Sequence, residues 1–293
     1  KVLSTFVEMG ADPSILYDHA PHIGTDVLRD VVRNLRNRII AGGGEVHFRS
    51  EVTEILEENG RVSGVKLADG TVVETEKVIL SVGHSARDLF EKLDRMKVFM
   101  EPKPFAVGLR IQHPQAQINR NQYGLEDAGK LGAAPYKVTA KTTSGRGVYS
   151  FCMCPGGFIV PAMTRAGESV VNGMSPSGRN SVFANSGIVT EIRLSDFEHL
   201  RAEHGELAGL RFQQQFEELA YRQIGDRQIA PAQRLADFVA GKASGSLPRC
   251  SYVPGIAATR MEQWMPGTIS DALRGGLAFS AADRYQALIY PEF

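Results

Sequence analysis

The first hundred residues combine a helical hydrophobic repeat with segments of strand-like pattern. From Thr25 to Ile40 apolar side chains recur every three or four residues, which predicts an amphipathic helix. Three glycines, Gly42 to Gly44, follow directly and are expected to end that helix. Glu45 to Phe48 alternates polar and apolar residues, so we expect a short strand after the glycines.

A β-meander is predicted next, from two tight turns between short alternating segments. Asn59-Gly60 is a hairpin signal because both residues accept positive φ, and it joins strands expected at Glu51 to Glu57 and Val62 to Leu67. Asp69-Gly70 makes a second turn into a strand at Thr71 to Glu74.

An almost wholly apolar run follows the meander, from Lys77 to Val82. A run of this length without alternation predicts a strand that is buried on both faces. Gly83 ends it, and Ser85 to Met96 has the pattern of a helix. Ligands gather beyond the carboxyl ends of such strands in α/β proteins, so this strand end is a candidate binding site.

The pattern changes after Glu101-Pro-Lys-Pro104, and short glycine-rich strands become frequent. The expected strands are Phe105 to Gln112, Tyr136 to Lys141, Gly147 to Phe151 and Phe158 to Pro161, and the expected helices are Leu207 to Ile224 and Thr268 to Tyr290. We therefore predict an α/β and α+β fold with an α/β portion over residues 1–100, a mostly β unit over 101–265, and a final helical segment over 266–293.

Composition and charge exclude several classes of protein. Lys plus Arg and Asp plus Glu both number 33, so the chain lacks the basic excess typical of nucleic-acid binding, and no apolar run has the length of a membrane span. Three cysteines do not make a disulfide framework, which favours a reducing, cytoplasmic location. The chain starts without methionine and stops directly after a helical pattern, so we expect it to be cut from a longer protein.

Two motifs suggest chemistry that their surroundings do not support. Gly124 to Lys130 has the spacing of a phosphate loop, but Leu131 stands where Ser or Thr is required to hold magnesium, and no apolar strand precedes it. Cys152-Met-Cys154 lacks a second pair of metal ligands, so no metal site is predicted. The two cysteines are either small apolar side chains that lead into a glycine turn or a thiol close to a redox cofactor.

Two further sites have both a structural and a functional interpretation. His84 follows the apolar run and is either a local hydrogen-bonding cap or a functional side chain, and Ser85 is a candidate N-cap of the next helix. The segment from Asn172 to Ser186 is rich in glycine, serine and asparagine. Such a segment is either a surface loop or a loop whose backbone approaches a ligand closely.

Four blocks in order carry a resemblance to a known family. They are Gly83-His-Ser-Ala-Arg-Asp-Leu-Phe90, Lys103-Pro-Phe-Ala-Val-Gly-Leu-Arg-Ile-Gln-His-Pro114, Gly147-Val-Tyr-Ser-Phe-Cys-Met-Cys-Pro-Gly-Gly157 and Val171-Asn-Gly-Met-Ser175. They resemble an uncharacterised family of bacterial FAD-dependent dehydrogenases, related to HI0933-like and glutathione-reductase-like flavoproteins. The resemblance implies that residues 1–100 are the middle portion of a discontinuous FAD-binding domain. Residues 101–265 would be an inserted substrate domain, and 266–293 a helix returning toward the FAD-binding domain.

The resemblance also implies a set of cofactor contacts. The backbone of Val52 would face the adenine, and the end of the apolar run would pass under the dinucleotide. The expected cofactor-binding residues are Val52, Ser81, Val82, Gly83, His84, Ser85, Asn172, Gly173, Met174 and Arg179. The candidate catalytic residues are His84, Arg87 and Cys152.

The glycine fingerprint of dinucleotide-binding proteins is missing from this sequence. Its nearest approach is Gly145-Arg-Gly147, with Ser150 in the place of the third glycine. We therefore expect a fragment of an FAD-dependent oxidoreductase that by itself is inactive and binds FAD weakly or not at all, with a small-molecule substrate and an unknown electron donor or acceptor in the parent protein. The alternatives are a non-catalytic binding module on the same fold and a flavoprotein that acts on a large substrate such as RNA, which the neutral charge disfavours.

Overall fold

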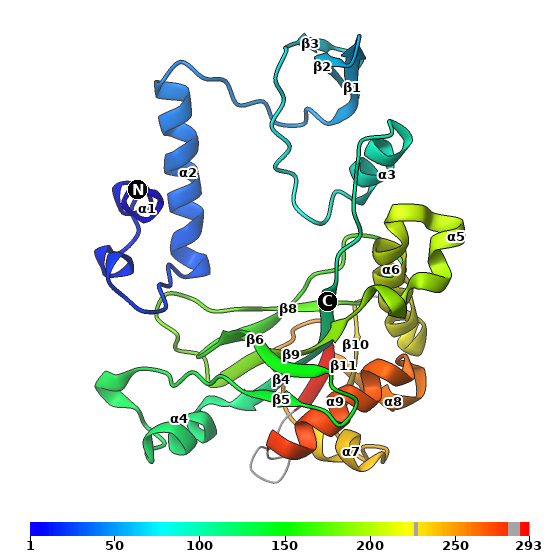
Figure 1. Ribbon diagram of the computed structural model, residues 1–293. Helices are drawn as coiled ribbons and strands as arrows, with labels where there is room; N and C mark the ends of the chain where they lie inside the picture. The colour runs from blue at the N-terminus through cyan, green and yellow to red at the C-terminus, as the bar shows by residue number, and fades with distance from the viewer. Residues whose placement is uncertain (226–227, 281–287, 293) are drawn as a thin grey trace. The chain divides into compact units, whose positions relative to one another are not determined.

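The computed structural model describes residues 1–225, 228–280 and 288–292, and it divides into two compact units. Unit 1 comprises residues 1–21 and 28–100, and unit 2 comprises residues 22–27 together with the chain from Glu101 onward. This boundary coincides with the proline-rich segment at which the sequence pattern changes. The described elements are mixed α and β, as the sequence predicts (Figure 1).

Unit 1 contains a helical part and a small sheet. Its helices are α1 (Val2–Glu8), the 3-10 helix η1 (Pro13–Leu16), α2 (Thr25–Ala41), whose first turn counts with unit 2, and α3 (Arg87–Arg95). The helix predicted from Thr25 to Ile40 is confirmed. The side chain of Arg38 pairs with Glu8 at 2.6 Å, and Val31 on the same helix is fully buried.

The predicted meander is also confirmed. Its strands are β1 (Val52–Glu58), β2 (Arg61–Leu67) and β3 (Val72–Glu74), paired antiparallel in that order. Asn59 and Gly60 have φ of +54° and +77°, the positive values that a two-residue hairpin turn requires.

Two other strands predicted in unit 1 are absent from the described residues. Glu45 to Phe48 and Lys77 to Val82 have no strand assignment, and Ile79 is 90% exposed. An apolar run becomes a buried strand only where neighbouring strands take up its backbone hydrogen bonds, and no described strand pairs with this one. The turn at its end is present, since Gly83 has φ of +71°, and the next helix begins at Arg87 rather than Ser85.

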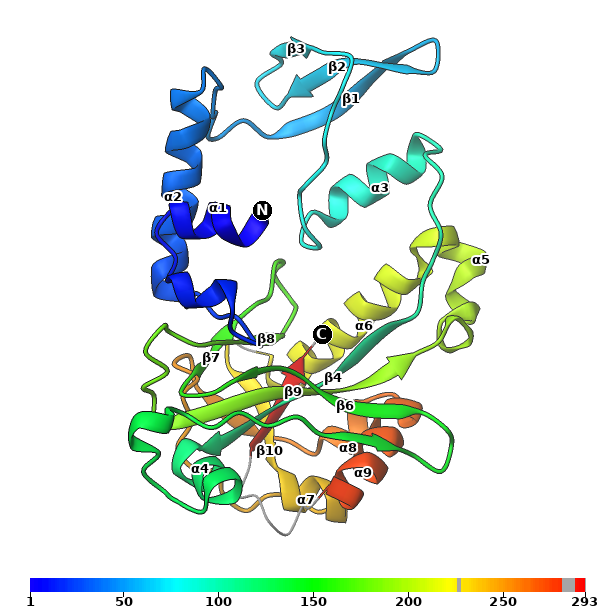
Figure 2. The same cartoon turned by 60° about the vertical axis from the view of Figure 1, so that its left-hand side comes forward.

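Unit 2 is built on a seven-stranded sheet with strand order β11-β10-β12-β4-β9-β6-β5 (Figures 1 and 2). Its strands are β4 (Phe105–Pro114), β5 (Thr139–Lys141), β6 (Gly147–Cys154), β9 (Phe183–Ile192), β10 (Ala230–Arg234), β11 (Ile256–Ala258) and β12 (Leu288–Glu292). All neighbours are antiparallel except β10 and β11. A separate two-stranded ribbon consists of β7 (Phe158–Pro161) and β8 (Val171–Met174).

Helices cover one face of this sheet and surround its ends. They are α4 (Gln115–Tyr123), α5 (Arg201–His204), α6 (Ala208–Ile224), α7 (Leu235–Ala240), α8 (Met261–Trp264) and α9 (Gly267–Ser280). Short 3-10 helices are η2 (Gly129–Leu131), η3 (Leu194–Asp196), η4 (Glu198–Leu200) and η5 (Gly205–Leu207).

The main core lies between the sheet and these helices. Leu109 and Ile111 of β4 pack with Phe216 of α6 and Leu273 of α9, and all four are buried. Each fully buried side chain of this size contributes about 1.5–3 kcal/mol to the free energy of unfolding. The alternation that sends Leu109 and Ile111 into this core sends Arg110 to the opposite face, against which the β7–β8 ribbon packs.

The last predicted helix is wrong in part. Helix α9 ends at Ser280, residues 281–287 lie outside the described residues, and 288–292 form strand β12 between β4 and β10. The described helix packs within unit 2 because Ile269, Leu273 and Leu277 join its core. The described part of this segment therefore belongs to unit 2, and its expected return toward the FAD-binding domain stays a prediction.

Candidate functional site

The second face of the large sheet carries a buried arginine. The side chain of Arg110 on β4 is fully buried. Its Nη1 donates hydrogen bonds to Asn185 Oδ1 at 2.6 Å and to the carbonyl oxygen of Cys152 at 3.3 Å, and its Nη2 donates to Asn172 Oδ1 at 3.3 Å. Strands β4, β6, β8 and β9 thus converge on one guanidinium, whose charge is held among these neutral oxygen acceptors.

Strand register explains why these side chains meet. Gln112 of β4 pairs directly with Asn185 of β9, and directly opposed residues share one face of an antiparallel sheet. Arg110 lies on that face because it is two residues from Gln112. Asn185 also pairs with Cys154 of β6, and all four side chains are buried. The result is a polar layer inside the protein.

Cys152 sits at an irregularity of strand β6. Between Phe151 and Cys154 the chain advances three residues, while β9 advances only two, from Gly187 to Asn185. One extra residue in one strand is a β-bulge, which bends the strand and redirects side chains. Cys152 has φ of +46° and is exposed, whereas Cys154 is buried.

The surroundings of Cys152 favour its thiolate. The Cys154 sulfur lies 3.4 Å from the carbonyl oxygen of Cys152, and it is also within hydrogen-bonding reach of the Cys152 sulfur. Its single proton can be donated to only one of these two atoms at a time. Hydrogen bonding from Cys154 lowers the pKa of Cys152, partial burial opposes this, and the charge and donors of Arg110 lower it further, to about 5. These contacts therefore favour the thiolate form of Cys152.

Gly173 allows the β7–β8 ribbon to approach Arg110 closely, and Gly156 allows the turn after β6 to approach the backbone of Arg179. A Cβ on Gly173 would lie 2.1 Å from Asn185 Oδ1 and 2.2 Å from Arg110 Nη1. A Cβ on Gly156 would lie 1.7 Å from the carbonyl oxygen of Arg179. At both positions only glycine fits without movement of these neighbouring atoms.

The loop after β8 is fixed to the start of α2, within unit 2. Asp26 accepts hydrogen bonds from the backbone N–H of Ser177 at 2.8 Å and from its hydroxyl at 2.7 Å. The hydroxyl first, and then the N–H, lower the pKa of Asp26 to about 2. The Thr25 N–H donates to the Ser175 carbonyl oxygen at 3.2 Å, which joins the same two segments. These contacts hold one end of the segment that includes Arg179.

The structure brings together only some of the residues selected from the sequence. Cys152, Asn172 and Gly173 lie in the layer around Arg110, Met174 follows in β8, and Arg179 contacts the Gly156 turn. The remaining predicted residues belong to unit 1, and all but Arg87 of α3 are exposed: Val52, Ser81, Val82, Gly83, His84 and Ser85.

Sequence reasoning missed Arg110 and Asn185 as site residues. The signal for Arg110 was its alternation with apolar neighbours in β4, a pattern that normally indicates a solvent-facing side chain. His113 of β4 was also missed as a buried polar residue. Burial lowers its pKa to about 3, so it is neutral, and its Nε2 lies 2.9 Å from the Tyr136 hydroxyl.

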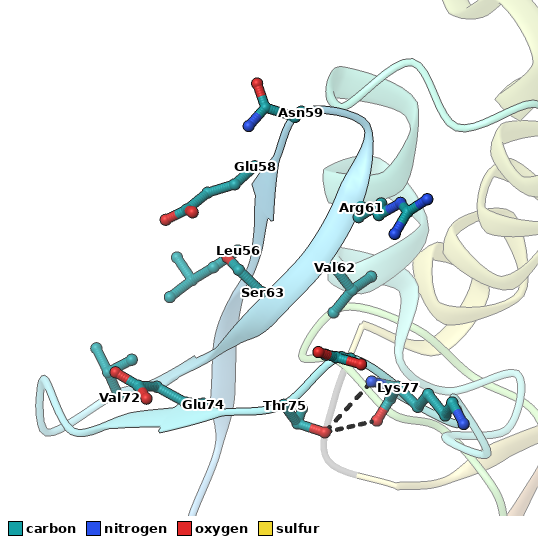
Figure 3. A pocket seen from close by; sticks show the side chains of 11 residues that line it. Leu56, Glu58, Asn59, Arg61, Val62, Ser63, Val72, Glu74, Thr75 and Lys77 are labelled. Carbon is teal, nitrogen blue, oxygen red and sulfur yellow. Dashed lines mark hydrogen bonds between the residues drawn. The ribbon is translucent and has the colours of Figure 1, made fainter.

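Unit 1 has two pockets of its own. One, of about 1080 Å³, opens on the meander and is shown in Figure 3. It is lined by Leu56, Glu58, Asn59, Arg61, Val62, Ser63, Val72, Glu74, Thr75, Glu76 and Lys77. The other, of about 430 Å³, lies between β1 and α3, with Lys92 and Arg95 in its wall. Neither pocket is lined by a site residue that was predicted from the sequence. The first pocket has both acidic and basic side chains in its wall, so its charge does not indicate a class of ligand.

One motif rejected from the sequence, the phosphate-loop spacing at Gly124, has a different structure. Gly124, with φ of +75°, caps the C-terminus of α4 rather than following a strand, so the phosphate-loop spacing has no phosphate-loop structure. The described residues contain no group of three or more His, Cys, Asp or Glu side chains that could hold a metal ion. In the same part of the chain, no helix has both the length and the apolar content needed to cross a bilayer.

Comparison with known proteins connects both units to flavoproteins. Residues 104–286 match the family model described as "FAD-dependent protein, C-terminal domain-like", and residues 19–148 match "FAD dependent oxidoreductase". An uncharacterized protein of Clostridium beijerinckii is 38% identical over 280 residues, which cover 94% of this chain and 52% of that relative. The chain thus spans about half the length of the relative that it matches. The finer relation to HI0933-like flavoproteins stays a prediction.

Proposed function

Because this chain belongs to the family of FAD-dependent proteins that share this C-terminal domain, we propose that it forms part of an FAD-dependent oxidoreductase. The observation that carries the proposal is the match over residues 104–286, which include the strands β4, β6, β8 and β9 that supply Arg110 and its hydrogen-bond acceptors. FAD, when bound, supplies the electron chemistry, and the protein supplies binding, orientation and charge. The substrate is a small molecule, the electron donor or acceptor is a separate species, and we propose a cytoplasmic location.

The polar layer of unit 2 fits a group that presents hydrogen-bond acceptors. Asn185 Nδ2 and Arg179 Nε are buried donors without a hydrogen-bond partner among the described residues. Asn172, which accepts a hydrogen bond from Arg110, is exposed, so a ligand can reach the edge of this layer there. The ring edge of a flavin carries carbonyl oxygens and nitrogen acceptors, and a positive charge nearby stabilises its reduced, electron-rich form. We assign to Arg110 this electrostatic role and to Asn172 and Gly173 direct contact.

The exposed segment of unit 1 has a different role in this proposal. The backbone of Val52 binds the adenine, and residues 81–85, around the left-handed Gly83, bind the dinucleotide. His84 and Arg87 remain the candidates for catalytic contacts in unit 1, with Cys152 in unit 2. Support for these assignments comes from the family resemblance and from the exposure of residues 81–85.

Anaerobic mixing of the full-length holoprotein with NADH and with NADPH tests the oxidoreductase activity. The expected result is loss of oxidised-flavin absorbance with a nicotinamide and its return on addition of an electron acceptor. A bound flavin that neither nicotinamide reduces, and that no acceptor reoxidises after photoreduction, would contradict the proposal.

We also propose that residues 1–293 alone bind FAD weakly. The sequence contains no G-x-G-x-x-G segment, whose free N–H groups bind the pyrophosphate in such folds. Losing two or three charge-assisted hydrogen bonds, at about 1.5–3 kcal/mol each, weakens binding by several powers of ten. Flavin fluorescence during titration measures this directly, and submicromolar binding by residues 1–293 would overturn the assignment.

A further inference from the structure

Cys152 differs from the other two cysteines in its backbone and in its exposure. It is exposed, whereas Cys154 is buried and Cys250 is half-buried. Its φ of +46° lies in the left-handed region, which is unfavourable for a residue other than glycine. Strain of this kind persists only where the surrounding structure enforces it, and it concentrates at functional sites.

The bulge in β6 gives Cys152 and Cys154 different solvent exposure, which regular strand alternation would not. In a regular strand, residues two apart point to the same face, so Cys152 and Cys154 would both be buried or both be exposed. The extra residue between Phe151 and Cys154 breaks this relation. Cys154 stays in the buried layer next to Asn185, while Cys152 is exposed at its edge.

The buried layer behind Cys152 favours a negative charge on its sulfur. Arg110 is fully buried, donates to the Cys152 carbonyl oxygen, and acts on the thiol through its charge and its N–H donors. A charge removed from water interacts more strongly with its neighbours than an exposed one does. The Cys154 thiol adds a further hydrogen-bond donor. A structural cysteine needs none of these contacts.

We propose that Cys152 is a redox-modification site, an exposed thiolate that small hydroperoxides oxidise to a sulfenic acid. The sulfur attacks the distal oxygen of the hydroperoxide, so that an S–O bond forms as the O–O bond breaks. The released hydroxide or alkoxide takes a proton from water. Sulfur loses two electrons and the peroxide gains them. Low pKa, solvent access and a neighbouring thiol are the features of cysteines that react in this way.

The reactivity proposed for Cys152 does not require bound FAD, because it comes from Arg110, Cys154 and the bulge. The expected size of the effect follows from the pKa of about 5, compared with about 8.5 for an ordinary thiol. At pH 6 the thiolate fraction is about 300-fold larger. A less basic thiolate is also less nucleophilic, which reduces the gain to about tenfold.

The test measures the reactivity of each cysteine by mass spectrometry across the pH range. Iodoacetamide reports nucleophilicity, and hydrogen peroxide followed by dimedone reports sulfenic acid. In the folded chain the alkylation rate of Cys152 should rise through pH of about 5. In the urea-unfolded chain it should rise through about 8.5. At pH 6 hydrogen peroxide should label folded Cys152 about tenfold faster than the same residue in the unfolded chain.

Variants show whether Cys154 and Arg110 are responsible for the reactivity of Cys152. Cys154→Ala removes the donor and Arg110→Met removes the charge, so each should move the Cys152 midpoint to higher pH. Cys154→Ser keeps a donor and serves as the matched control, with a midpoint near that of the wild type. If Arg110→Met does not fold, the wild-type pH profile and the comparison of Cys154→Ala with Cys154→Ser still test the proposal. A wild-type midpoint near 8.5, no dimedone adduct on Cys152, or a midpoint that Cys154→Ala leaves unchanged would overturn the proposal.

Discussion

Replacing Gly173 with alanine tests the packing of the polar layer around Arg110. The new Cβ would lie 2.1 Å from Asn185 Oδ1 and 2.2 Å from Arg110 Nη1, and both atoms belong to buried side chains. No flexible end can swing away into solvent, so the guanidinium or the ribbon must move. Gly173 does not have positive φ, which means that the substitution adds steric conflict without backbone strain.

The cost of Gly173→Ala follows from two contributions. Overpacking of a filled interior costs about 1–3 kcal/mol. Loss of the charged hydrogen bond between Arg110 and Asn185 costs about 1.5–3 kcal/mol, part of which the displaced groups recover. We expect a decrease of about 3 kcal/mol in the free energy of unfolding of unit 2, or roughly 6–12 °C in melting temperature for a unit of this size.

Urea unfolding followed by circular dichroism measures the effect, with Gly147→Ala as the matched control. Gly147 begins β6 in the same sheet and does not have positive φ, and a Cβ added to it would meet no atom within 4 Å. Its replacement should be neutral or slightly stabilising, by up to about 1 kcal/mol. Equal stability of the Gly173→Ala and Gly147→Ala proteins would refute close packing around Arg110.

Two further predictions concern an ion pair and the exposed apolar run. Asp196→Asn should lower the free energy of unfolding by about 3 kcal/mol, because it breaks an ion pair with Arg146 that has two hydrogen bonds and nearly buried side chains. The matched control is Glu206→Gln, which removes a partly exposed ion pair with Arg201 and should change the free energy of unfolding by less than about 0.5 kcal/mol. Burial opposes ionisation of Asp196, but the interaction with Arg146 outweighs burial and lowers the pKa of Asp196. The ion pair therefore contributes its full stabilisation above the ordinary carboxyl pKa and loses it as pH falls through the lowered pKa. Urea unfolding should show the stabilities of wild type and Asp196→Asn converging at acidic pH, and a stability difference that does not change with pH would refute this. Ile79→Asp should change unfolding of unit 1 by less than about 0.5 kcal/mol, while Val31→Asp, at a fully buried position, should cost several; a large loss for Ile79→Asp would mean that the predicted buried strand exists after all.

Local patterns in the sequence were sufficient to predict the elements whose structure depends on residues close to them in the chain. The helix from Thr25, the turn at Asn59-Gly60, strand β7 and helix α6 all lie within a residue or two of their predicted bounds. In each case the hydrophobic period or the turn chemistry is contained in the segment itself.

Features that depend on distant partners could not be predicted in this way. The apolar run to Val82 has the composition of a buried strand, but composition does not show whether neighbouring strands exist to pair with it. Arg110 alternates with apolar residues as a solvent-facing side chain would, and only the β7–β8 ribbon on that face makes it buried. The polar layer is therefore a product of tertiary packing, while Cys152 and Asn172 were recognised from composition and resemblance.

The most direct test of FAD dependence is the identity and amount of flavin in the full-length protein. The protein should be purified, loaded with FAD if needed, separated from free flavin and denatured, and the released cofactor quantified by chromatography and mass spectrometry. FAD at close to one molecule per chain is the predicted result. A full-length, folded protein that retains no FAD after reconstitution would contradict the proposed function.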